Sequence, residues 1–202
     1  MNETTSGIFK SAHEALTFAY RFDSQQYGRS AMAIALANHA PSGRGLGGLD
    51  GAGQAGMIRR MVRNQGELYE ALARARYLPR TLHCSCDAPC CSGMRPNLAW
   101  NAAIRTIGQM SIAATPGCVS ILGLRCGIVA RYFGNKDIDL GRLADHCDVH
   151  RNTATKHNGL IVTWLRGQPG KGSERAKPGM EAQAMQAIAE ALEAAGLLIV
   201  ER

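Results

Sequence analysis

The chain has 202 residues, 46% of them hydrophobic and 19% charged, which is the composition of a globular protein and excludes a disordered one. Only 5% are aromatic, and alanine and leucine are abundant, so we expect an all-α fold. The 23 basic and 16 acidic residues give a net charge of +7, and most of the basic residues are arginine. Because the basic excess lies between Arg59 and Arg166 rather than in a tail, this charge favours a nucleic-acid partner.

The start of the sequence lacks the basic and then apolar segments of a signal peptide. The most apolar stretch, from Gly117 to Phe133, is too short and too polar to span a bilayer. We therefore expect a cytoplasmic protein without membrane contacts. Thiols stay reduced in that compartment, so clustered cysteines favour a metal site over disulfides.

The first 42 residues form a predicted N-terminal helical segment, with helices over Ile8 to Phe22 and Ser30 to Asn38. Seven glycines between Gly43 and Gly56 then predict a loop, which we interpret as a linker over residues 43–56. The linker contains two matches to the nucleotide-binding pattern G-x-G-x-x-G. No strand precedes either match, so this pattern lacks the context that phosphate binding requires.

A helical region with a cysteine-rich insert is expected over residues 57–116. Its helical pattern breaks near Gly66, stops at Pro79, and resumes from Asn97 to about Ala113. The insert brings together four cysteines and one histidine, namely His83, Cys84, Cys86, Cys90 and Cys91.

The insert predicts a structural zinc site, because such sites use four cysteine or histidine ligands in a tetrahedron. The four cysteines are the expected ligands, and His83 is a substitute because adjacent Cys90 and Cys91 are awkward ligands of one ion. The alternative is a loop of free thiols, which would be prone to oxidation. No neighbouring group could activate a metal-bound water, so we expect a site that staples the loop rather than a catalytic one.

A third domain is expected over residues 117–202. A helix from Val119 to Phe133 precedes a short amphipathic helix, a tight turn and a second helix over residues 139–164. The second helix carries an apolar stripe formed by Ala154, Leu160, Ile161 and Trp164.

This segment resembles the helix-turn-helix of bacterial and phage regulators. The resemblance rests on the pattern Leu-Ala-(four residues)-Val-x-Arg-x-Thr, here Leu143, Ala144, Val149, Arg151 and Thr153. The sequence departs from the family pattern at Asp148, where glycine is usual, at His150, where serine or threonine caps the helix, and at His157, where an apolar residue is common.

The resemblance implies that the second helix enters the major groove of double-stranded DNA. The outward positions then carry side chains suited to base edges and phosphates, namely His150, Arg151, Asn152, Thr155 and Lys156. The competing interpretation is an ordinary helical hairpin whose polar face meets water.

The C-terminal part begins with a glycine-rich segment over residues 167–179, which predicts either a flexible linker or a wing-like loop near the DNA. A helix from Glu181 to Ala195 follows and ends at Gly196. Residues 197–200 are apolar and predict a short extended segment that packs against the helix-turn-helix or pairs with a second copy. The expected fold is thus a helical bundle with a zinc-stapled loop, a helix-turn-helix and a short C-terminal extended segment.

A cysteine-rich insert followed by a helix-turn-helix in a basic chain of this size is similar in plan to the Q-type late antitermination proteins of lambdoid phages and prophages. Those proteins combine a zinc-binding insert, a DNA-binding region and a surface for RNA polymerase, although their C-x2-C pairs are absent here. The resemblance implies a sequence-specific DNA-binding transcription regulator that acts with RNA polymerase in a bacterial or phage-infected cell.

Two alternatives stay open at this point. One is an adaptor whose zinc-stapled helical domain binds protein partners, and the other is a nucleic-acid-processing accessory protein. We expect no catalytic activity, because the sequence shows no paired carboxylates, no H-x-E motif and no nucleophile in a recognisable setting.

Overall fold

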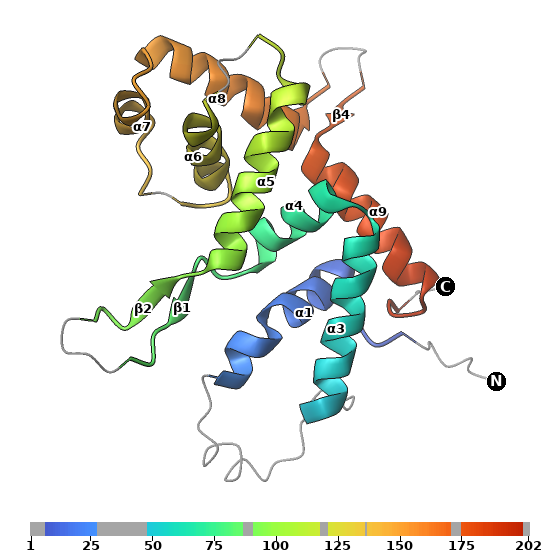
Figure 1. Cartoon of the computed structure of the whole chain (residues 1–202). Helices are drawn as coiled ribbons and strands as arrows, with labels where there is room; N and C mark the ends of the chain where they lie inside the picture. Colours follow the sequence, from blue (N-terminus) through green and yellow to red (C-terminus); the bar gives the residue numbers. More distant parts are fainter. Residues whose placement is uncertain are drawn as a thin grey trace. The chain divides into compact units, whose positions relative to one another are not determined.

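The computed structural model describes residues 7–27, 48–86, 91–117, 121–135, 137–170 and 175–199. These residues form eight helices and four short strands, so the prediction of a mostly helical chain is confirmed (Figure 1). The chain divides into two compact units, each built from separate stretches of sequence. The first unit contains residues 1–66, 77–97 and 187–202, and the second contains residues 67–76 and 98–186.

In the first unit, helix α1 (Ala12–Tyr27) packs against helix α3 (Gly48–Asn64). Ser11 begins α1 by accepting a hydrogen bond from the backbone N–H of Glu14, as an N-cap residue does. The buried face of α1 is apolar and is made of Ala15, Leu16, Ala19, Tyr20 and Phe22. Arg59 joins the two helices, because its Nε donates to the carbonyl oxygen of Ala19 at 2.8 Å.

The prediction of a loop over residues 43–56 is wrong from Gly48 onward, because residues 48–56 form the first half of α3. Gly51, Ala55, Ile58 and Val62 are buried at helical spacing, which places one continuous stripe against the rest of the unit. Each glycine in a helix costs about 1 kcal/mol relative to alanine, and burial of this stripe outweighs that local preference. Residues 43–47 and the helix predicted from Ser30 to Asn38 lie outside the described residues.

The C-terminal segment also lies in the first unit. Helix α9 (Met180–Ala194), whose part from Ala187 onward belongs to this unit, is followed by Gly196 at a φ of 69°. Leu198 then forms a parallel bridge with Phe9. Ile199 N–H donates to the carbonyl oxygen of Phe9 at 2.8 Å. The segment therefore pairs with the N-terminal part of its own chain, which corrects the expectation that it packs against the helix-turn-helix or a second copy.

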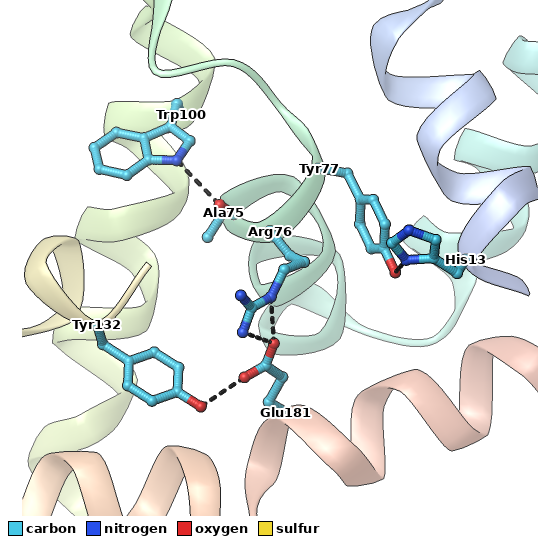
Figure 2. Close-up of polar contacts among 7 residues, drawn as sticks. All are labelled: His13, Ala75, Arg76, Tyr77, Trp100, Tyr132 and Glu181. Carbon is cyan, nitrogen blue, oxygen red and sulfur yellow. Dashed lines mark hydrogen bonds and ion pairs between the residues drawn. The ribbon is translucent and has the colours of Figure 1, made fainter. Parts of the chain in front are cut away.

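The third part of the first unit is a hairpin. Strands β1 (Thr81–His83) and β2 (Met94–Pro96) are antiparallel, and His83 faces Met94 in their register. Helix α4 (Glu67–Tyr77), which begins after Gly66 at a φ of 108°, precedes the hairpin. At its end, the Tyr77 hydroxyl forms a 3.1 Å hydrogen bond with Nδ1 of His13 in α1 (Figure 2).

The second unit is built around helices α5 (Leu98–Ala114) and α6 (Leu122–Tyr132), which pack against each other. They touch closely at Gly108, where an added Cβ would lie 2.8 Å from the sulfur of Cys126. Helices α7 (Leu140–His146) and α8 (Arg151–Arg166) pack on α6, and Figure 1 shows the three helices grouped together. The predicted boundaries of these helices are confirmed to within about three residues.

Strands β3 (Gly167–Gln168) and β4 (Lys177–Pro178) form a minimal antiparallel hairpin directly after α8. Gly167 and Gly179 sit so close to the opposite backbone that an added Cβ on either would clash. The wing-like loop predicted over residues 167–179 is therefore closed by two paired strands at its base, and its tip lies outside the described residues.

A polar cluster links three helices of the second unit. Glu181 of α9 accepts hydrogen bonds from Arg76 of α4 and from the Tyr132 hydroxyl of α6, the latter at 2.6 Å (Figure 2). Burial and the hydrogen bond to this carboxylate raise the pKa of Tyr132 to about 12. The indole N–H of Trp100 in α5 also donates to the carbonyl oxygen of Ala75 in α4. Each of these polar groups thus has a partner on a neighbouring helix, so a structural role in joining the helices accounts for the cluster.

Candidate functional site

The turn between α7 and α8 has a well-defined hydrogen-bonding pattern. Val149 N–H donates to the carbonyl oxygen of Ala144 at 2.9 Å, and Asp148 N–H donates to that of Asp145 at 3.3 Å. Asp148 lies between them at a φ of 52°, the left-handed conformation that ends many helices and is usually taken by glycine. Aspartate tolerates this conformation, so the departure from the family pattern at this position does not prevent the turn.

Both helices of this hairpin begin at a capping side chain. The Asp139 carboxylate accepts a 2.9 Å hydrogen bond from Arg142 N–H, and this bond holds the pKa of Asp139 below its ordinary value. At the start of α8, Nδ1 of His150 accepts a hydrogen bond from Asn152 N–H at 3.2 Å. His150 therefore performs the capping role that serine or threonine has in the helix-turn-helix pattern.

One face of α8 is buried, and its composition differs from the sequence prediction. The buried residues are Ala154, His157, Ile161 and Leu165. Leu160 is 41% exposed and Trp164 is half-buried, so assigning Leu160 and Trp164 to the core stripe was wrong. Both residues lie next to the true stripe, and a helical period of 3.6 residues leaves that choice open when apolar residues are adjacent.

All five side chains predicted to face outward from α8 are exposed, namely His150, Arg151, Asn152, Thr155 and Lys156. Arg151 pairs with Asp145 of α7 at 3.0 Å between Nη2 and Oδ2, and this pair raises the pKa of Arg151. The Thr155 hydroxyl donates to the carbonyl oxygen of Arg151 at 3.0 Å, which leaves the hydroxyl oxygen free to accept. The surface thus offers cationic, amide and hydroxyl groups over the first turns of one helix.

Two polar side chains, Arg125 of α6 and His157 of α8, are buried in this unit, and their burial was not predicted. Arg125 of α6 is 1% exposed, and its Nη1 donates to the hydroxyls of Ser111 and Thr115 at 3.0 and 2.8 Å. His157 of α8 is 3% exposed, and burial, followed by the charges of Arg125 and Lys156, lowers its pKa. The sequence signals for these two residues were Arg125, which interrupts the most apolar stretch, and His157, which stands where the helix-turn-helix pattern commonly has an apolar residue.

The cysteine cluster lies on the β1–β2 hairpin of the first unit. The sulfur atoms of Cys84, Cys86 and Cys91 all lie within 4.8 Å of one another. Cys84 follows β1 directly and is fixed there by a 2.9 Å hydrogen bond from its N–H to the carbonyl oxygen of Gly93. Gly93 has a φ of 74°, which allows the chain to reverse ahead of β2. Three of the predicted ligands can therefore hold one metal ion.

Of the two other predicted ligands, the structure describes only His83, and it does not join this group. Cys90 lies outside the described residues, and His83 is exposed and is not among the side chains that converge. Hydrogen bonding to Cys86, with a smaller contribution from Cys84, raises the pKa of the Cys91 thiol. The three thiols therefore interact with one another, as residues that share a small volume must.

Comparisons of this chain with family models, with curated proteins and with solved structures give no match. Within the described ranges, no helix has both the length and the apolar character needed to cross a membrane.

Proposed function

We propose that the protein is a sequence-specific double-stranded DNA-binding transcription regulator of the phage or prophage type, and that α8 is its recognition helix. The observation that carries this proposal is the exposure of all five outward side chains on α8, whose opposite face is buried against the rest of the unit. A hairpin of this kind can insert one helix into the major groove while the other helix crosses the DNA backbone.

The five side chains divide by chemistry into base-reading and backbone-binding groups. Arg151 can donate two hydrogen bonds to guanine, and Asn152 can exchange two with adenine. The Thr155 hydroxyl oxygen can accept, since its hydrogen is donated to the Arg151 carbonyl, and Lys156 carries a point charge suited to phosphate. Because Nδ1 of His150 accepts from Asn152 N–H, its Nε2–H is the ring group left to donate to DNA.

The overall charge supports the same partner. The net charge is +7, which attracts the DNA backbone without regard to sequence. Such attraction alone gives only non-specific binding, so base selectivity has to come from the α8 surface.

The test is selection from a library of random duplex DNA by the purified, zinc-loaded protein. We expect an enriched sequence, and Arg151→Ala should cost about 1–3 kcal/mol at one base position only. Lys156→Ala should weaken binding to all sequences alike and reduce the salt dependence by about one counterion. Binding without enrichment, or an unchanged preference in Arg151→Ala, would contradict the assignment of α8.

The cysteine cluster is proposed to hold a structural zinc ion that staples the β1–β2 hairpin. The described thiols of Cys84, Cys86 and Cys91 would supply three ligands, and the sequence offers Cys90 or His83 as the fourth. Metal analysis of purified protein should give about one zinc per chain. Cys86→Ser should lose the metal, whereas Cys147→Ser, which changes a cysteine of the other unit, should retain it.

RNA polymerase is the protein partner that the resemblance to Q-type antitermination proteins implies. Once a binding site is known, transcription through a terminator placed downstream of it measures this directly. Read-through that depends on both the site and the protein supports antitermination. Selective DNA binding without read-through would limit the function to repression or activation.

A further inference from the structure

Arg151 and Asp145 both lie at helix ends that disfavour their charge. Arg151 is the first residue of α8, where unpaired N–H groups give the helix end a partial positive charge. Asp145 lies in the last turn of α7, where unpaired carbonyl oxygens give a partial negative charge. Interaction with the helix ends therefore does not account for a charged residue at either position.

The arginine side chain lies along one face of α7. Gly141 and Asp145 are four residues apart and thus share a face of that helix. Arg151 Nη2 contacts Asp145 Oδ2 at 3.0 Å, and an added Cβ on Gly141 would lie 3.7 Å from Cζ of the same guanidinium. The guanidinium therefore lies within van der Waals distance of the α7 surface at Gly141, and Asp139 adds a second favourable charge.

The pair contributes little to folding. The side chains of Arg151 and Asp145 are 70% and 58% exposed, and ion pairs in that environment have small effects on stability. An exposed pair does, however, limit where the guanidinium can lie. With Nη2 bound through one hydrogen, Arg151 keeps its remaining N–H donors for a second partner.

We propose that Asp145 is a positioning residue that orients Arg151 for guanine, an inference that rests on the proposed DNA-binding function. The carboxylate holds the guanidinium so that its free N–H groups can face guanine O6 and N7. Because the side chain is already restricted, it loses less conformational entropy when it binds. The same carboxylate repels phosphates, so it discourages Arg151 from binding the backbone instead. Asp145 thereby raises selectivity at one base pair while lowering affinity for DNA in general.

The test compares Asp145→Asn with Asp148→Asn on the sequence enriched from a random duplex library. Both variants remove one negative charge from the same turn, but Asp148 is exposed at its left-handed position and asparagine tolerates that conformation. A general electrostatic effect must therefore appear in both. Binding is measured for the enriched duplex and for duplexes with each base pair replaced in turn.

We expect Asp145→Asn to lower the preference for guanine at the Arg151 position by about threefold or more, out of the roughly 5- to 150-fold that such a contact provides. Asp148→Asn should keep the preference, and Asp145→Glu should restore part of it. Far-ultraviolet circular dichroism should be the same for all three variants, since the pair is exposed.

The outcomes separate this inference from the proposed function. If the wild-type protein selects no sequence, the proposed function fails. If it selects a sequence that depends on Arg151, but Asp145→Asn and Asp148→Asn have the same preferences as the wild type, the DNA-binding function stands and the positioning role of Asp145 is overturned. Equal loss in both variants would also overturn it, because the effect would then be charge alone.

Discussion

Helices α3 and α8 are of similar length, and each buries one stripe of side chains, but their exposed faces differ. The exposed positions of α3 include Gly53 and Gly56, which add no interactions and weaken the helix. The exposed face of α8 begins with five polar side chains, and only His150, which caps the helix, has a role in folding. Packing thus determines the first helix, whereas the second carries additional chemistry suited to a ligand.

The difference leads to separable effects of substitution. Changes to the exposed face of α3 should alter stability without altering binding. Changes to the exposed polar face of α8 should alter binding and leave stability almost unchanged, except at its cap.

The largest expected effect concerns the buried stripe of α8. Ile161→Ala should lower the free energy of unfolding by about 2–5 kcal/mol, because Ile161 has no exposed surface and its loss leaves a cavity. The neighbouring Leu160→Ala should cost much less, since Leu160 is 41% exposed. Urea denaturation of both variants measures this, and equal losses would show that the α8 face is misassigned.

Glycine substitutions test whether α3 is an intrinsically weak helix held by packing. Gly53→Ala should stabilise the protein by about 0.5–1 kcal/mol, because apart from the adjacent backbone of its own helix no heavy atom lies within 4 Å of the added Cβ. Gly66→Ala, at a φ of 108°, should instead destabilise it by about 1–2 kcal/mol. Thermal unfolding of both variants gives the comparison, and a destabilised Gly53→Ala would argue for a loop in place of the first half of α3.

The cap of α8 is the one exposed polar position expected to affect folding. His150→Ala should lower stability by about 1 kcal/mol, because Asn152 N–H then loses its side-chain acceptor. His150→Ser keeps an acceptor and should lose less. Should His150→Ala and His150→Ser unfold at the same urea concentration, the capping role would be excluded.

The smallest effect is the pH dependence contributed by His157. Burial disfavours its charged form, so its pKa in the folded chain is below the ordinary value of 6.5. The unfolded chain then binds the proton more readily, and the free energy of unfolding falls as the pH is lowered through 6.5 toward the folded pKa. His157→Gln should show a shallower fall than the wild type in urea titrations at several pH values. An identical fall would mean that His157 does not contribute.

The sequence predicted the parts of the structure that local chemistry determines. The short amphipathic α7 and the turn at Asp148 both follow from patterns within about twenty residues. The proximity of Cys84, Cys86 and Cys91 was likewise predicted from their spacing.

Other features depend on contacts distant in sequence, and the sequence did not predict them. The glycine-rich start of α3 is helical in a unit where α3 packs on α1, and no local signal outweighs four glycines. The burial of Arg125 depends on hydroxyls contributed by Ser111 and Thr115 in and after α5. The pairing of Leu198 with Phe9 joins the two ends of the chain, which no periodicity can indicate.

The central claim is that α8 reads DNA sequence. The most direct test measures the affinity of the wild-type protein for its enriched duplex and for a scrambled duplex of the same composition, across a range of salt concentrations. A regulator should bind the enriched duplex about a thousandfold more tightly or better, and this ratio should persist as both affinities fall with salt. Equal affinities that fall together with salt would show that only phosphates are recognised, and would contradict the claim.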